Sequence, residues 1–106
     1  MQRICFHLRV DPDRLAEYRQ RHASVWPEMR NALSAAGWHN YSLFLDKTGL
    51  LTGYFECENL VQAQRAMEST SVNERWQAEM AEYFVELGGG PPDRAIVPIP
   101  EIFHLD

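Results

Sequence analysis

Residues 3–12 decide the fold, and they read RICFHLRVDP. Apolar and polar side chains alternate over residues 3–10, and a period of two is typical of a strand with one buried face. The face predicted to be buried carries Ile4, Phe6, Leu8 and Val10, and the opposite face carries Arg3, Cys5, His7 and Arg9. Asp11 and Pro12 then predict a helix start, because Asp is a favoured N-cap and Pro suits the first helical position.

Residues 15–37 have the pattern of a helix that is interrupted once. Mostly apolar and aromatic side chains recur every three or four positions, which predicts a single helical stripe. The stripe comprises Leu15, Tyr18, His22, Val25, Met29 and Leu33. Pro27 lies inside it, and proline removes a backbone donor and clashes with the preceding turn. We therefore expect a kink or a break near residues 24–26 and a helix end at Gly37.

Two β-rich runs follow, at residues 38–46 and 50–58. The short turn between them, Lys47-Thr48-Gly49, predicts that they form a hairpin. Asn59 is then expected to cap a helix that continues to about Ser69.

A further helix is predicted next, because Ser71 and Glu74 match a capping box, in which each side chain bonds the other residue's backbone. Its apolar stripe carries Val72, Trp76, Met80, Tyr83 and Leu87. Residues 88–93, which read GGGPPD, predict an irregular loop. The alternation of residues 101–105 predicts a last strand.

The order of strand, helix, hairpin, helical segment and strand predicts an α+β fold, a ferredoxin-like antiparallel sheet with helices on one face. The 106 residues suit a single domain over residues 1–106. Apolar and aromatic side chains occur on both faces of residues 38–58, so we expect a second subunit to cover the free face. Two sheets paired in this way give a dimeric α/β-barrel type of assembly with a pocket for a small molecule.

Charge and composition narrow the function. The net charge of −5 argues against nucleic-acid partners and anionic membranes, which bind through Lys and Arg. No apolar run approaches the roughly 18 residues of a membrane span. The N-terminus has no signal-peptide core, so we expect a cytoplasmic protein. The histidines and cysteines lack metal-ligand spacing, and no nucleotide-binding motif occurs, so no metal or cofactor is predicted.

Tyr18 and His22 are the most informative pair, because positions four apart are neighbours on one helical face. The same face carries Leu15 and Val25, so the pair points toward the core. The residues alone leave two interpretations open, a hydrogen-bonded core histidine or a functional site.

Asn40, Tyr41 and Trp76 have the chemistry of a sugar site. An indole offers a flat apolar face to ring C–H groups, while an amide and a phenol meet hydroxyls without bearing charge. Core packing is the alternative role for Trp76, and Tyr41 also fits as a residue that covers the sheet.

Several short motifs extend over nearly the whole chain. They are Tyr18-Arg19-Gln20-Arg21-His22, Trp26-Pro27-Glu28, His39-Asn40-Tyr41, Leu45-Asp46-Lys47, and Ser69-Thr70 with Arg75-Trp76. Together they resemble the L-rhamnose mutarotase family, and the chain length agrees as well. The resemblance implies a cofactor-free isomerase that interconverts the α and β anomers of L-rhamnose, and a homodimer.

Carried over by position, the resemblance also implies residue roles. His22 looks like the proton donor, and Tyr18, Tyr41 and Trp76 look like substrate contacts. Gln77 stands where family members often have a second Trp, and we expect it to contact the sugar as well.

The chemistry of mutarotation suits these residues. A proton must reach the ring oxygen and another must leave the anomeric hydroxyl, and both are general acid–base steps. A histidine with a pKa near its usual value of about 6.5 serves either role near neutral pH. The base stays open between Tyr18, a water and a group from a partner subunit. Two other functions fit the architecture, a cofactor-independent monooxygenase and a non-catalytic sugar-binding dimer.

Overall fold

The computed structural model describes residues 1–87 and 90–106. Within these two ranges the centre is a four-stranded antiparallel sheet with the strand order β2-β3-β1-β4. The strands are β1 (Gln2–Val10), β2 (His39–Leu45), β3 (Leu50–Cys57) and β4 (Phe84–Val85). This order confirms the predicted ferredoxin-like α+β fold.

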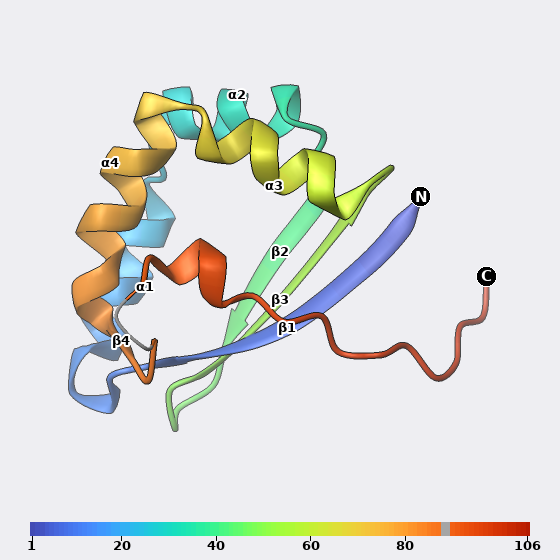
Figure 1. The fold of residues 1–106 in the computed structure, drawn as a ribbon. Coiled ribbons are helices and arrows are strands. Elements are labelled where there is room, and N and C mark those ends of the chain that lie inside the picture. Colours follow the sequence, from blue (N-terminus) through green and yellow to red (C-terminus); the bar gives the residue numbers. More distant parts are fainter. Residues whose placement is uncertain (88–89) are drawn as a thin grey trace.

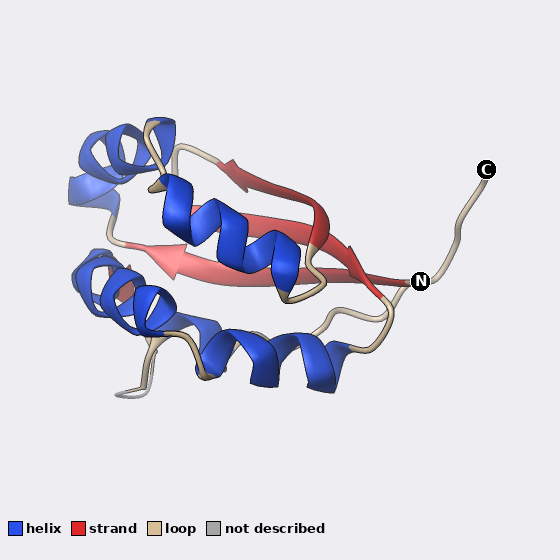
Figure 2. Ribbon diagram, turned by 90° about the horizontal axis from the view of Figure 1, so that it is seen from above, coloured by secondary structure: helices blue, strands red, loops and turns tan. Residues whose placement is uncertain are grey.

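The described residues form four α-helices, which gather on one side of the sheet (Figure 1). They are α1 (Leu15–Ala23), α2 (Pro27–Ala35), α3 (Leu60–Glu68) and α4 (Ser71–Met80). Seen from above, the helices form two rows, α1 with α2 and α3 with α4 (Figure 2). Short 3-10 turns complete the fold: η1 (Pro12–Arg14), η2 (Ala81–Tyr83) and η3 (Pro92–Ala95).

The predicted break in the first helical segment is confirmed. α1 ends at Ala23 and α2 begins at Pro27, a position where the missing N–H of proline breaks no helical hydrogen bond. Before α1, the side chain of Asp11 caps the 3-10 turn η1 by accepting a hydrogen bond from the Asp13 N–H at 3.0 Å. Gly37 ends the segment at φ +89°, a conformation that glycine adopts without steric cost.

The two later helices begin at capping residues. Asn59 caps α3 as predicted, because its side chain accepts from the Gln62 N–H at 3.0 Å. The prediction for α4 is wrong by one residue. Thr70 is the N-cap, with extended backbone and an Oγ1 that accepts from the Asn73 N–H at 3.3 Å, while Ser71 already lies in the first turn.

The fourth strand is not where the sequence predicts it. Residues 101–105 form no strand, and the expectation of a last strand there is wrong. The backbone touches the edge of β1 once, where the Ile99 N–H donates to the carbonyl of Cys5 at 2.8 Å. Strand β4 instead pairs Phe84 with Val10, directly after η2.

The segment between α4 and the C-terminal tail also differs from its prediction. The helix ends at Met80, so Tyr83 and Leu87 of the expected stripe lie beyond it. Two residues of the predicted loop, 88 and 89, lie outside the described residues. The loop then closes in the 3-10 turn η3, which begins at Pro92.

The core lies between the sheet and the helices. Phe6 and Phe55 are completely buried there, and Trp38 stacks on Phe55 with 4.0 Å between the ring centroids. The ring of Phe6 lies directly over Gly53, where no Cβ atom would have room. A glycine is therefore needed at this position of β3.

The other side of the sheet, which we call the outer face, carries no helix (Figure 1). Its side chains alternate with the buried ones and comprise Arg3, Cys5, His7, Ser42, Phe44, Thr52, Tyr54 and Glu56. Phe44, on the edge strand β2, is 63% exposed, and so large an exposed ring is unusual for a phenylalanine.

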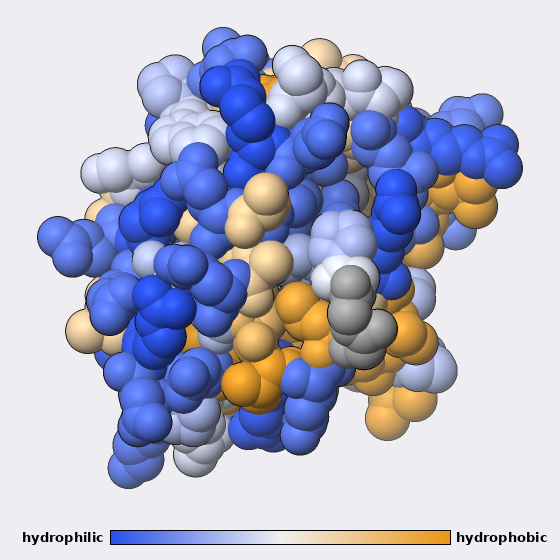
Figure 3. Space-filling view, turned by 60° about the vertical axis from the view of Figure 1, so that its left-hand side comes forward, coloured by the Kyte–Doolittle hydropathy of each residue, from blue (hydrophilic) through white to orange (hydrophobic). Residues whose placement is uncertain are grey.

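Hydrophilic side chains cover much of the surface that Figure 3 shows, and apolar ones gather in its lower part. Among the described residues no helix is both long and apolar enough to cross a lipid bilayer.

Candidate active site

A cavity of about 610 Å³ lies between the helices and the sheet. Each layer of the fold contributes to it, because α1, α2, α4, β2 and η3 all supply lining residues. Its polar lining includes Tyr18, His22, Tyr41, Asn73, Gln77 and Asp93, together with Arg30, Asn40 and two serines. The volume suits a single small molecule.

Helix α1 positions Tyr18 and His22 together, as the spacing of four predicts. Tyr18 is 4% exposed, and the two rings lie 4.2 Å apart between centroids. His22 Nδ1 lies 3.0 Å from the backbone carbonyl oxygen of Tyr18. Since a carbonyl only accepts, Nδ1 must be the protonated nitrogen, and Nε2 is left for a ligand.

Burial sets the charge of this imidazole. His22 is partly buried and lies edge to face with Trp76, 5.5 Å between centroids. Desolvation lowers the pKa of His22 below its usual value, the Arg21 charge lowers it further, and the hydrogen bond to the Tyr18 carbonyl opposes both. The ring is therefore mostly neutral near pH 7, and its Nε2 accepts a proton.

Two phenols offer hydrogen bonds inside the cavity. Burial raises the pKa of Tyr18 well above its usual range. Burial also raises the pKa of Tyr41, and the nearby Asp93 carboxylate adds to this increase. Both phenols therefore remain protonated and neutral at all physiological pH values. Such groups bind hydroxyls and ether oxygens without the cost of burying a charge.

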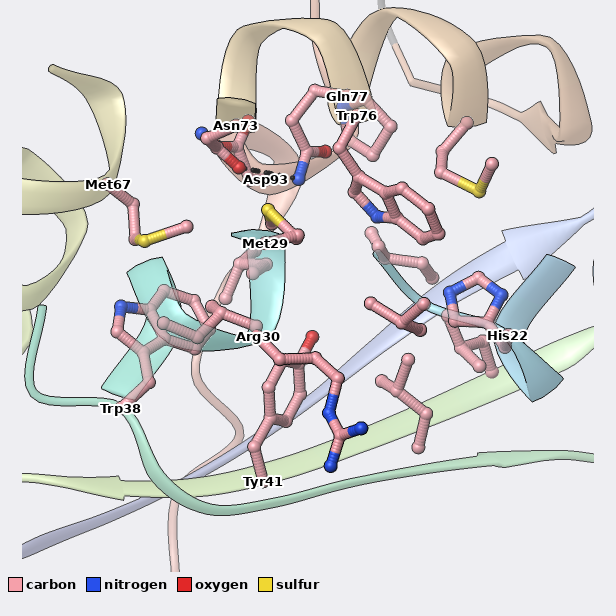
Figure 4. Close-up of a pocket in the computed structure, with 18 of the residues that line it drawn as sticks. His22, Met29, Arg30, Trp38, Tyr41, Met67, Asn73, Trp76, Gln77 and Asp93 are labelled. Carbon is pink, nitrogen blue, oxygen red and sulfur yellow. Dashed lines mark hydrogen bonds between the residues drawn. The ribbon is translucent and has the colours of Figure 1, made fainter. Parts of the chain in front are cut away.

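Trp76 belongs to the core and to the cavity lining at once. It is 6% exposed, and Trp26 packs edge to face against it at 5.0 Å between centroids. The two roles that the sequence left open for this residue are thus compatible. Figure 4 shows its indole directed into the space above Tyr41.

Asn40 lies at the cavity edge, but its amide is engaged elsewhere. Its Nδ2 donates to the Glu56 carboxylate on the outer face at 3.4 Å. The backbone of Asn40 has φ +50°, and the β2–β3 register shifts between His39 and Ser42. At this irregularity in the strand, the Asn40 amide bonds to Glu56 while the residue also lines the cavity.

Gln77, on α4, lines the cavity. Hydrogen bonds connect its side chain to two residues that the sequence analysis missed. Its Nε2 donates to Oδ1 of Asn73 at 3.1 Å, and Nδ2 of Asn73 donates to Oδ2 of Asp93 at 2.9 Å. Asn73 lies within the segment whose sequence matches a capping box, and Asp93 lies within the predicted loop. The local signal for Asn73 is a polar residue beside the apolar stripe of α4, whereas Asp93 has none.

The described residues contain no cluster of three or more His, Cys, Asp or Glu side chains that could hold a metal ion. Among the groups that the cavity offers are a neutral imidazole, two phenols, an indole face, three amides, a carboxylate and the guanidinium of Arg30. Fold and site together define a small ferredoxin-like α+β protein with a site suited to proton transfer on a polyhydroxylated small molecule.

Comparison with known proteins identifies the family. The family model described as L-rhamnose mutarotase matches residues 3–105. L-rhamnose mutarotases from Bacillus subtilis and Oceanobacillus iheyensis are 39% and 38% identical, and each comparison covers 100% of both chains. A crystal structure of an L-rhamnose mutarotase from Formosa agariphila has the same fold, with a TM-score of 0.78, 23% identity and 100% coverage of both chains. The chain belongs to the L-rhamnose mutarotase family.

Proposed function

We propose that the protein is an L-rhamnose mutarotase, an isomerase that interconverts the α and β anomers by opening and closing the sugar ring. Family membership and the names of the relatives support this reaction. The observation that supports the proposal is that His22 lines the cavity while the carbonyl of Tyr18 holds its Nδ1, which leaves Nε2 for the sugar.

The proton that leaves the anomeric hydroxyl can serve as the one that reaches the ring oxygen, because both oxygens are bonded to the same carbon. Neutral His22 accepts the proton of the anomeric hydroxyl at Nε2. The imidazolium then donates that proton to the ring oxygen as the bond between this oxygen and the anomeric carbon breaks. The open aldehyde rotates, and the same transfers in reverse close the ring on its other face. His22 is thus the proton donor to the ring oxygen, and no net proton is gained or lost.

The other residues of the site bind the sugar. The phenols of Tyr18 and Tyr41 donate hydrogen bonds to its oxygens, and the indole of Trp76 covers its apolar ring face. Gln77 occupies a lining position beside Trp76 and contacts a hydroxyl. These neutral groups suit a polyol better than the aromatic substrate of a monooxygenase, which would need a mostly apolar cavity.

We also propose that the active form is a homodimer in which the outer faces of two sheets pack together. Three apolar side chains of the C-terminal tail are exposed, Ile102 by 97%, Phe103 by 78% and Leu105 by 80%. Phe44 adds a fourth at the outer face. Exposed apolar groups in such number are typical of an interface, and a second copy of the chain is the occupant that the resemblance implies.

Saturation-transfer NMR on L-rhamnose tests the function directly, because it measures the rate at which the anomeric protons exchange. We expect the protein to accelerate exchange well above the buffer rate. Binding of L-rhamnose without faster exchange would identify a sugar-binding dimer instead. Oxygen consumption with aromatic substrates, and no faster exchange, would identify a monooxygenase.

A further inference from the structure

Three polar side chains, Gln77, Asn73 and Asp93, form a connected chain at one end of the cavity. Gln77 fixes the orientation of the Asn73 amide, since it donates to Oδ1 and leaves Nδ2 to donate to Asp93. Asn73 is 4% exposed, so both halves of its amide are satisfied inside the protein. Buried polar groups that are fully satisfied are held rigidly, and this chain therefore fixes the Asp93 carboxylate.

Asp93 lies apart from the imidazole that moves the proton. In Figure 4 the Trp76 indole lies between Asp93 and His22, so the carboxylate faces another part of the bound ligand. The bond from Asn73 goes to Oδ2, which leaves Oδ1 for a ligand. Figure 4 also shows the Tyr41 hydroxyl pointing into the space between these groups.

The chemistry of a carboxylate selects what binds at this end. An ionised carboxylate only accepts hydrogen bonds, so its ligand must supply donors. Because Asn73 holds Oδ2, Oδ1 is the oxygen that accepts from a hydroxyl of the ligand. Bonds of this kind to a charged acceptor are stronger than those between neutral groups.

We propose that Asp93 is a specificity-determining residue, whose Oδ1 accepts a hydrogen bond from a sugar hydroxyl remote from the anomeric carbon. Asn73 and Gln77 are the residues that position it. This inference rests on the proposed function only in requiring that the ligand is L-rhamnose or a similar pyranose. It assigns Asp93 to binding and leaves the proton transfer to His22.

The substitution Asp93→Asn tests the proposal, because it keeps the shape of the side chain and replaces one acceptor oxygen by a donor. We expect KM for L-rhamnose to rise at least about 10-fold, with kcat within about 2-fold, since the bonds are made equally in ground and transition states. Thermal unfolding checks that the variant is folded, and Asp93→Ser provides a second variant. Glu68→Gln is the matched control, because Glu68 pairs with Arg94 of the same turn at 3.9 Å outside the cavity lining.

Analogues of L-rhamnose that lack one ring hydroxyl distinguish this role from a merely structural one. Wild-type protein is expected to bind the analogue lacking the recognised hydroxyl about 10-fold more weakly or worse. The Asp93→Asn variant should show little further loss with that analogue. Gln77→Met should also raise KM, but by a smaller factor in the Asp93→Asn background than in wild type, because part of its effect acts through the carboxylate.

Other outcomes overturn the proposal. A fall in kcat at unchanged KM would make Asp93 a proton acceptor, and unchanged kinetics would show that it does not meet the sugar. Equal sensitivity of wild type and variant to every analogue would also contradict it. These results differ from failure of the proposed function, in which wild-type protein itself leaves anomer exchange at the buffer rate.

Discussion

The two faces of the sheet carry side chains from the same strands but have different surroundings. On the helix side Phe6 and Phe55 are buried, and the neighbouring polar groups of the cavity have partners inside the chain. On the outer face the Tyr54 hydroxyl donates to Glu56 at 2.7 Å, while Phe44 has most of its ring exposed. The proposed reaction lies on one face and the proposed dimer contact on the other, so substitutions on the two faces should have different effects.

The largest effect is expected from His22→Ala on the cavity side. Loss of the proton-transfer group should reduce anomer exchange by about 10²–10⁴-fold, since this is the usual contribution of general acid–base catalysis. Saturation-transfer NMR measures the rate. The matched control is His7→Ala on the outer face, which should retain the wild-type exchange rate. A wild-type exchange rate in the His22→Ala variant would show that the imidazole does not take part in the reaction.

Trp76→Ala should affect stability and binding together, because this indole lies in the core and the cavity. Removing a buried aromatic ring typically costs about 3–5 kcal/mol of unfolding free energy, which urea denaturation measures. KM for L-rhamnose should rise in the folded fraction. Val61→Ala, at a 54% exposed position of α3, should change stability by less than about 0.5 kcal/mol. An unchanged unfolding midpoint for Trp76→Ala would contradict its core role.

Deleting residues 101–106 should weaken the proposed dimer with little change in the cavity. The deletion removes three large apolar side chains, each worth about 1.5–3 kcal/mol when fully buried, so the dissociation constant should rise at least about 10-fold. Analytical ultracentrifugation measures it. Val61→Ser, which removes an exposed apolar group on the helix side, serves as the control. A monomeric full-length protein would refute the assignment of the outer face.

The smallest effect concerns pH. Because burial lowers the pKa of His22, the neutral and proton-accepting ring persists to more acidic pH than in a free histidine. We therefore expect kcat to be flat near pH 7–8 and to fall only below about pH 6.5, the usual histidine pKa. A pH series of the exchange rate tests this, with a rate that falls as pH rises through neutrality as the contradicting result.

Much of the fold follows from local pattern. The alternation of residues 3–10 and the proline at position 27 predict β1 and the α1–α2 break, because each depends on neighbours in sequence. Strand β4 escapes prediction since its two residues become a strand only by pairing with Arg9 and Val10. Residues 101–105 show the opposite case. Their alternation predicts a strand, but none forms because no strand lies beside them in the described chain.

The residues of the site also divide into those that local sequence pattern predicts and those that it does not. Tyr18 and His22 are predictable because four residues bring side chains together on any helix. The contact of Asn73 with Asp93 spans 20 residues and depends on how η3 packs against α4, which no local pattern encodes. Asn40 has the right chemistry, but a shift in strand register that the sequence does not reveal sends its amide to the outer face.

The break at Pro27 has an electrostatic consequence for the proposed reaction. It makes α1 short and places His22 in the last turn, where the aligned peptide dipoles leave a partial negative charge. An imidazolium that forms there is stabilised by typically about 0.3–1 kcal/mol, up to roughly 2 kcal/mol where the site is partly buried. In an uninterrupted helix through residues 24–26, the partial negative charge would lie at a later C-terminus, away from the imidazole. The interruption therefore places a fixed counter-charge beside a cation that exists only while the sugar ring is opening.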